Sequence, residues 1–473
     1  MKEKFENLKK KILAFLSIKR NKIITGVVGG VVLVAIALSI GLCAANNQGA
    51  HQHEFINYVS NNDATENTDG TKTAKCTGCN ETDTIADVGS ATGTKELVYD
   101  LNTETNEYAV KGIEESFAGK ELYIPMYHEG KKVTSILEQA FMSKETVEKV
   151  TITGNIKTIG TYAFAACDKI TALTLNEGIE TIGDEVFYDL AIEEVTLPNS
   201  ITSLGKGVFY SCSNLMKVTL GNGLTTIPEE AFAYCGRLDD FKISESVTTI
   251  KEGAFQDCGL ISLTIPSSVT TIENYAFTYC SKLVEVFNES SLNIGTGDDD
   301  EFGRLNMYVK TVKHAGEKSD IDRREDGFCF YKYNNVNYLL AYTGHETEIV
   351  LPESYNGEEY EIYQYGFSRN EQLKKVTISN KVTKIGSQAF SDCSNIESID
   401  LGTGVKIIQD HAFYNNALTS IVIPLNVEEI EFFIFSGCEK LTNIYCEAAS
   451  KPAGWADNWN GRCNATVTWS YSK

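Results

Sequence analysis

A phenylalanine recurs along this chain at intervals of 22 or 23 residues, in two series separated by a gap. The surrounding pattern is I-x-x-x-[AV]-F-x-x-C-x-x-L-x-x-[VL]-x-[IL], which residues 250–266 match almost completely. A fixed period of this length is typical of a solenoid, because each coil buries its apolar residues against those of the next coil. The sequence therefore predicts a repeat solenoid in two blocks, with these rings stacked inside. They are Phe141, Phe164, Phe187, Phe209, Phe232, Phe255 and Phe277, then Phe367, Phe390, Phe413 and Phe435.

Each repeat is predicted to contain one short strand and one turn. Leu263 and Ile265 alternate with polar residues, which predicts a short strand with one face inward. The stretch before the phenylalanine predicts a tight helical turn, since Pro228 stands where a helix would begin. Strands of successive coils are expected to pair as a parallel ladder.

This motif resembles the BspA-type, or Treponema pallidum-type, leucine-rich repeats of bacterial surface proteins, and it is present in eleven copies in register. The resemblance implies a right-handed solenoid with short parallel strands, a cell-surface location and a role in adhesion or protein binding. It implies no enzymatic activity. Consistent with this, the sequence contains no G-x-S-x-G, P-loop or H-E-x-x-H motif.

Residues 23–42 form an uncharged segment long enough to span a bilayer as a helix. Lysines and arginines in residues 1–22 predict that the N-terminus is cytoplasmic and the bulk of the chain extracellular. Two alternatives are cleavage of a signal segment near Ala44 and lipid attachment to Cys43. All three place residues 44–473 outside the cytoplasm. The net charge of −22 argues against a nucleic acid partner.

Matching preambles precede the two blocks, at 97–141 and 328–367, and each is expected to form a β-hairpin that caps the open end of a solenoid. The tail 450–473 holds all three tryptophans and is expected to cap the other end. The predicted organisation is 1–22 basic cytoplasmic tail, 23–42 transmembrane anchor or long signal segment, 43–95 extracellular spacer, 96–140 N-terminal β cap, 141–287 first repeat block, 288–366 polar insert and second hairpin preamble, 367–446 second repeat block, and 447–473 C-terminal cap.

Seven cysteines stand three residues after a repeat phenylalanine. They are Cys167, Cys212, Cys235, Cys258, Cys280, Cys393 and Cys438. They form either a redox or metal ladder or a column of small buried thiols that donate weakly to the backbone. Asn370 and Asn416 occupy the same slot in other copies, which favours the second interpretation. Near the C-terminal cap, Cys446 and Cys463 could pair as a disulfide.

The spacer contains a possible metal site composed of His51, His53, Cys76 and Cys79. A C-x-x-C pair with two histidines is a plausible tetrahedral zinc set, and hence a structural zinc between residues 51 and 79. The stretch resembles a short H-x-F … C-x-x-C module found before repeats in Gram-positive surface proteins. It departs from that module at Glu66 and Thr94, where a further cysteine and histidine are usual. The alternatives are a disulfide between the two cysteines and a metal-free spacer.

A strip of outward-facing strand residues is the predicted ligand-binding surface. It comprises Thr151, Thr174, Lys217, Thr219, Lys242, Thr264, Lys375 and Thr377. Such a strip suits a broad protein contact more than a deep pocket, although threonine also favours strands in its own right. The first hypothesis is a surface protein that binds a protein ligand on a host or neighbouring cell. The alternative is an envelope scaffold or spacer without a dedicated ligand. Insert 288–327 is a second possible binding face.

Overall fold

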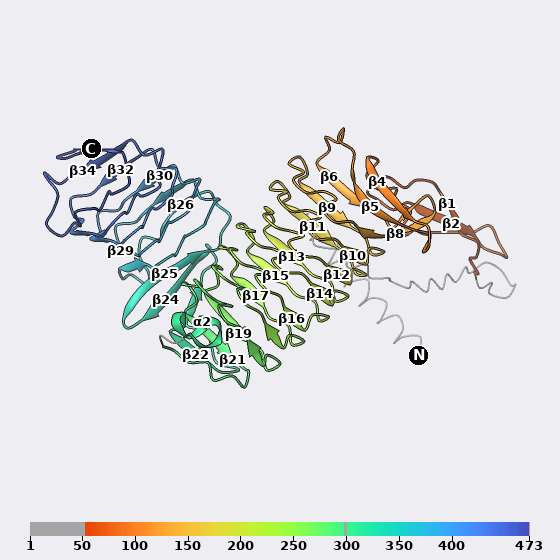
Figure 1. Cartoon of the computed structure of the whole chain (residues 1–473), viewed down its shortest axis with the longest axis horizontal. Coiled ribbons are helices and arrows are strands. Elements are labelled where there is room, and N and C mark those ends of the chain that lie inside the picture. The colour runs from red at the N-terminus through yellow and green to blue at the C-terminus, as the bar shows by residue number, and fades with distance from the viewer. Residues whose placement is uncertain (1–52, 298–299, 473) are drawn as a thin grey trace, which may run out of the picture. The chain divides into compact units, whose positions relative to one another are not determined.

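The computed structural model describes residues 53–297 and 300–472 (Figure 1). Residues Glu54–Lys473 form a compact unit of their own. The predicted membrane segment 23–42 lies outside the described residues, as do Cys43, Ala44 and His51. Within the described ranges, no helix has the length and apolar character needed to cross a membrane.

A small antiparallel sheet comes first, with strands β1 (Val59–Ser60), β2 (Thr71–Lys75) and β3 (Thr82–Ala86) in that order. Its core is sparse. The buried apolar residues of the described stretch 53–95 are Ala74, Cys76 and Ala91. A sheet this small buries too little apolar surface to be stable by itself.

The predicted N-terminal hairpin is confirmed. It consists of β4 (Leu97–Asn102) and β5 (Glu107–Ile113), which pair antiparallel. After β6 (Glu121–Ile124) and β7 (Tyr127–His128), β8 (Lys131–Ile136) runs parallel to β5. The hairpin covers the edge of β8, which starts one ladder, and β6 starts the other.

The first ladder of the first block is parallel, as predicted, and the block also contains a second parallel ladder, which was not predicted (Figure 1). The first continues through β9 (Lys149–Ile152), β11 (Ala172–Leu175), β13 (Glu194–Thr196), β15 (Lys217–Thr219), β17 (Asp240–Lys242), β19 (Ser262–Ile265) and β21 (Glu285–Asn288). The second continues through β10 (Thr158–Ile159), β12 (Thr181–Ile182), β14 (Ser203–Leu204), β16 (Thr226–Ile227), β18 (Thr249–Ile250) and β20 (Thr271–Ile272). Each ladder is divided into shorter hydrogen-bonded sheets along the block.

The repeat phenylalanines stack in two columns, one in each block, which confirms the central prediction. From Phe141 to Phe277 successive ring centroids lie 4.9 to 6.0 Å apart. From Phe367 to Phe435 the spacing is 4.8 to 5.9 Å. All of these rings are buried. Each coil therefore contributes one ring to an interior shared with its neighbours.

The expected helical turns before each phenylalanine are wrong; these stretches are consecutive turns. Ala163 donates its N–H to the carbonyl of Gly160 at 3.2 Å, whereas the N–H of Phe164 donates to Val186 of the next coil at 3.0 Å. Tyr162 has a φ of 58°, outside the range of a right-handed helix. Because alternate N–H groups point along the stack, the bond to the fourth preceding residue that defines an α-helix is not made.

The repeat cysteines are buried thiols that donate to the backbone, which confirms the structural interpretation. Cys212 Sγ lies 3.1 Å from the carbonyl oxygen of Phe187 in the preceding coil. The same bond to the preceding repeat phenylalanine is made by Cys167, Cys235, Cys258, Cys280, Cys393 and Cys438. Asn416 replaces the thiol with its side-chain amide, which donates to Phe390 at 3.0 Å. A buried donor therefore fills the slot in these coils, whereas Leu190 occupies it in the coil of Phe187.

These thiols make stability sensitive to alkali. Burial raises the pKa of Cys212 from 9.0 to about 12, because a thiolate is poorly solvated inside the coil. The thiol then contributes stability below pH 9 and loses it as the pH rises towards 12. By pH 10 about 1 kcal/mol per thiol has been lost. We expect the urea midpoint to fall less steeply between about pH 8 and pH 10 in Cys212→Ser than in the parent chain. Identical slopes would contradict this assignment.

A second hairpin module repeats the topology of the first, as the matching preambles predict. After β23 (Ile321–Arg323), strands β24 (Phe328–Tyr333) and β25 (Val336–Tyr342) pair antiparallel, and β27 (Tyr360–Ile362) runs parallel to β25. The second block follows, and its core is a cluster separate from that of the first block. Its first ladder comprises β26 (Glu348–Val350), β28 (Lys375–Thr377), β30 (Ser398–Asp400), β32 (Ser420–Ile423) and β34 (Asn443–Cys446), and its second comprises β27, β29 (Val382–Ile385), β31 (Ile407–Ile408) and β33 (Glu429–Ile430).

Part of the polar insert closes the end of the first block and is not an external loop. Helix α2 (Glu301–Tyr308) begins with residues at positive φ, and β22 (Thr311–Lys313) adds a rung beside β21. Phe277 donates its N–H to Gly303 at 2.9 Å, the bond that a further coil would accept. Leu305 and Val309 are buried in the core of the block. This part of the insert is therefore a cap.

The C-terminal tail also acts as a cap. The Trp459 ring packs edge-on against Phe435 at 6.3 Å, at the end of the second column. Strand β35 (Thr466–Thr468) adds a final rung beside β34. The disulfide considered between Cys446 and Cys463 is not formed: both are free, Cys446 buried in the ladder and Cys463 partly exposed.

Candidate functional site

All residues of the predicted binding strip lie on the first ladders, and none is buried. Thr151 pairs with Thr174 in the next coil, and Thr219 pairs with Lys242. The intervening residues, such as Val150 and Val218, point into the core. The period of two therefore assigns the outward face correctly, and its residues form rows across successive coils.

Ion pairs lie on and beside the strip, and their carboxylates come from residues outside it. Lys217 lies 3.0 Å from Asp240 in the next coil, and Lys149 lies 3.6 Å from Glu121. Because these pairs are exposed, each contributes little to stability. The result is a face of threonines and lysines, of which Lys217 is paired with a carboxylate, on an otherwise acidic chain.

The strip is interrupted where the second hairpin module packs against the first block. Arg323 pairs with the carboxylate of Asp239 and donates to Ser262 at 3.1 Å. Ile261 and Val284 of the first block share an apolar cluster with residues of the module, including Leu340. Lys375 and Thr377 therefore belong to a face separated from the first-block strip, which was not expected from the sequence.

A partly buried ion pair also joins the two blocks. Arg369 pairs with Asp257 at 2.7 Å, and its guanidinium lies over the ring of Tyr234. Burial raises the pKa of Asp257, while Arg369 acts in the opposite direction. Burial also lowers the pKa of Lys282, whose ammonium donates to Gly236 at 3.2 Å. The Arg369–Asp257 pair therefore joins the two blocks, whereas the Lys282–Gly236 bond joins coils of the first block.

Surface hollows among the described residues lie away from the strip. One, of about 270 Å³, lies beside the second hairpin and is lined by Tyr331, Tyr338 and Tyr363. Another borders Lys157 and Thr158 at the second ladder. A flat strand face suits contact with a macromolecule better than enclosure of a small ligand.

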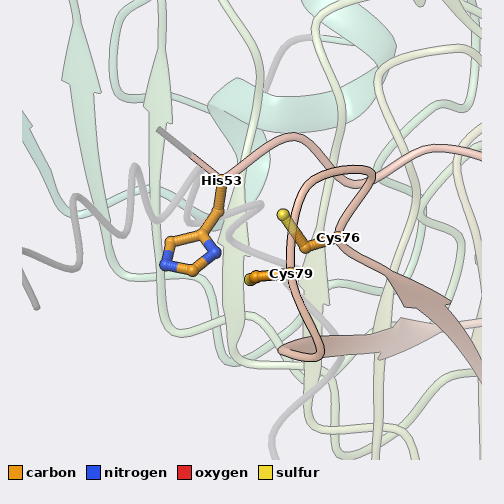
Figure 2. A group of neighbouring side chains, drawn as sticks. All are labelled: His53, Cys76 and Cys79. Atoms are coloured by element: carbon orange, nitrogen blue, oxygen red, sulfur yellow. The ribbon is translucent and has the colours of Figure 1, made fainter. Parts of the chain in front are cut away.

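Three of the four predicted metal ligands come together in the N-terminal sheet. The ligand atoms of His53, Cys76 and Cys79 lie within 4.8 Å of one another. Figure 2 shows the imidazole and both cysteine side chains side by side at the loop that follows β2. Cys76 is buried, and the other two are partly exposed. The two cysteines are not joined as a disulfide in the described structure. The fourth predicted ligand, His51, lies outside the described residues.

Stacked coils with two parallel ladders and a buried phenylalanine column define a leucine-rich-repeat solenoid. A model of the family described as BspA type leucine rich repeat region matches residues 134–261, 217–298 and 360–452. These matches cover more than half of the chain, which therefore belongs to the BspA-type leucine-rich repeat family.

Solved bacterial leucine-rich repeat proteins are similar at low sequence identity. A leucine rich cell surface protein from Faecalibacterium prausnitzii A2-165 is 22% identical, over 80% of this chain and 94% of that one, with a TM-score of 0.38. The Treponema pallidum leucine rich repeat protein is 23% identical, over 41% and 82%, with a TM-score of 0.33. The pneumococcal vaccine antigen PcpA is 21% identical, over 82% and 89%, with a TM-score of 0.30. No curated protein matches the chain.

Proposed function

We propose that this protein is a non-catalytic, right-handed solenoid that binds a protein ligand on a host or neighbouring cell. The proposed surface is the first-block part of the strip, from Thr151 to Lys242. The observation that carries the proposal is the outward face of β9 to β17, whose small side chains lie in rows over a rigid ladder. Because the ladder satisfies the backbone hydrogen bonds, this face can bind without ordering a loop and without that entropic cost.

The proposal includes a location outside the cytoplasm. It is supported by the uncharged segment 23–42 directly after the basic residues 1–22. Cleavage near Ala44 or lipid on Cys43 would leave the same part of the chain outside. Protease treatment of intact cells followed by fractionation tests the location. Repeats that resist protease until the cells are lysed would contradict it.

Introducing negative charge on the strip tests the binding surface. We expect Thr151→Glu, Thr174→Glu and Thr219→Glu together to weaken binding to host matrix proteins or neighbouring cells by about tenfold or more, because three carboxylates would have to be desolvated on contact. Binding is measured with the purified protein by biolayer interferometry and by cell attachment.

The matched control carries the same substitution on the second ladder. Thr158→Glu, Thr181→Glu and Thr271→Glu change three exposed threonines of β10, β12 and β20. This triple variant is expected to bind like the parent chain. Equal binding by both triple variants would exclude the strip, and an absence of binding by the parent chain would favour a scaffold without a dedicated ligand.

A further inference from the structure

The N-terminal sheet fixes the loop that carries both thiols. Cys76 directly follows β2, and Cys79 precedes β3. The N–H of Cys76 donates to the carbonyl of Glu81 at 2.8 Å, which closes the loop at its base. Both side chains therefore project from one short, hydrogen-bonded turn.

Backbone pairing also brings the histidine to this loop. Phe55 forms an antiparallel bridge with Cys76, and Thr77 donates its N–H to the carbonyl of Glu54 at 3.0 Å. His53 is bonded to Glu54 and so lies at the same edge. The convergence in Figure 2 thus follows from main-chain contacts on both sides of the cluster.

We propose that His53, Cys76 and Cys79 bind a zinc ion that joins the segment before β1 to the loop after β2. Two thiolates and one imidazole are donors that zinc prefers, and oxygen-seeking cations such as calcium are poorly suited to them. The proposal is independent of the binding strip and of any ligand that the strip takes.

The distances match a site that needs only small adjustment. With zinc–sulfur bonds of 2.3 Å and zinc–nitrogen bonds of 2.0–2.1 Å, the ligand atoms of a tetrahedral site lie about 3.5–3.8 Å apart. The three atoms here already lie within 4.8 Å of one another. Side-chain rotations can supply the remaining closure, and the fourth position is left for water or another donor.

The surrounding sheet also lacks the core that would otherwise stabilise it. Val59 and Val88 are 69% and 66% exposed, and Ile56 is 48% exposed. A small domain with so little buried apolar surface commonly relies on a metal or a disulfide. The ion would therefore stabilise the spacer without altering the solenoid.

Metal analysis of the full chain tests the proposal. The protein is purified in detergent under reducing conditions, loaded with Zn²⁺ and washed with a weak chelator. We expect one zinc per chain, and a Co²⁺-loaded sample with the charge-transfer absorption of thiolate ligands. Cys79→Ser and His53→Gln should lower zinc affinity by about tenfold or more. Cys463→Ser, which changes a partly exposed thiol in the C-terminal cap, should leave it unchanged.

Hydrogen exchange distinguishes specific binding from a folding defect. Zinc should slow amide exchange in 71–86 of the parent chain, but not in Cys79→Ser, while the repeats exchange equally in both. The proposal is overturned if the parent chain holds no zinc, if Cys79→Ser holds as much zinc as the parent, or if the cobalt spectrum lacks thiolate bands.

Discussion

Replacing Phe232 with alanine is expected to lower the free energy of unfolding of the first block by about 3–5 kcal/mol. The ring is fully buried and lies 5.6 and 5.7 Å from its neighbours in the column. Phe241 packs edge-on against it at 5.0 Å. Because the coils above and below are held by their own ladders, they cannot collapse into the space left, and a cavity remains.

The exposed Phe432 provides the control. It has the same side chain but is 47% exposed, so Phe432→Ala should change stability by less than about 1 kcal/mol. Chemical denaturation followed by circular dichroism gives the global effect. Hydrogen exchange should show faster opening in the coils next to Phe232. Equal losses in the two variants would mean that the column is not the core.

Replacing Arg323 with alanine is expected to cost about 2–4 kcal/mol, because it leaves a nearly buried carboxylate without its cation. The side chain of Asp239 is 7% exposed, and it also accepts a hydrogen bond from the N–H of Ile261 at 3.3 Å. Asp239→Ala should cost less, about 1–2 kcal/mol, since the side chain of Arg323 is 42% exposed and can turn to water. The order of the two losses is therefore predicted.

Arg324 is the matched control for this pair. It neighbours Arg323 but pairs locally with Asp326 at 2.6 Å on the surface, so Arg324→Ala should cost below about 1 kcal/mol. Urea unfolding compares the three variants, and hydrogen exchange in β24 and β25 reports release of the second module. If Arg323→Ala behaved like Arg324→Ala, the pair would not hold the module against the first block.

The repeat structure could be predicted because its information is local. A period of 22 or 23 residues places each phenylalanine and each thiol, and a period of two orients Leu263 and Ile265. Neighbouring coils then meet in the same register. The turns were predicted wrongly because the N–H of Phe164 takes its partner from the next coil, which no window of sequence contains.

Contacts between distant segments could not be predicted in the same way. Asp239 and Arg323 are 84 residues apart, and no repeat period relates them. Leu305 and Val309 are apolar residues in a polar stretch, and they were the available signal that part of the insert is a cap. The strip could be read from strand register, but its interruption depended on where the second module packs.

The metal cluster could be predicted in part from local sequence and in part not. The C-x-x-C spacing predicted two ligands on one loop, whereas the approach of His53 depends on the bridge between Phe55 and Cys76. That bridge joins segments about twenty residues apart through backbone groups, which side-chain patterns do not reveal. The participation of His51 stays a prediction.

A double-mutant cycle on neighbouring rings tests most directly whether successive coils share one interior. Phe187 and Phe209 are stacked at 5.2 Å, and each is changed to leucine singly and together. We predict a coupling energy of about 0.5–1.5 kcal/mol for this pair. The pair Phe187 and Phe255, three coils apart, should be additive within about 0.5 kcal/mol. Additivity in both pairs would contradict a continuous column.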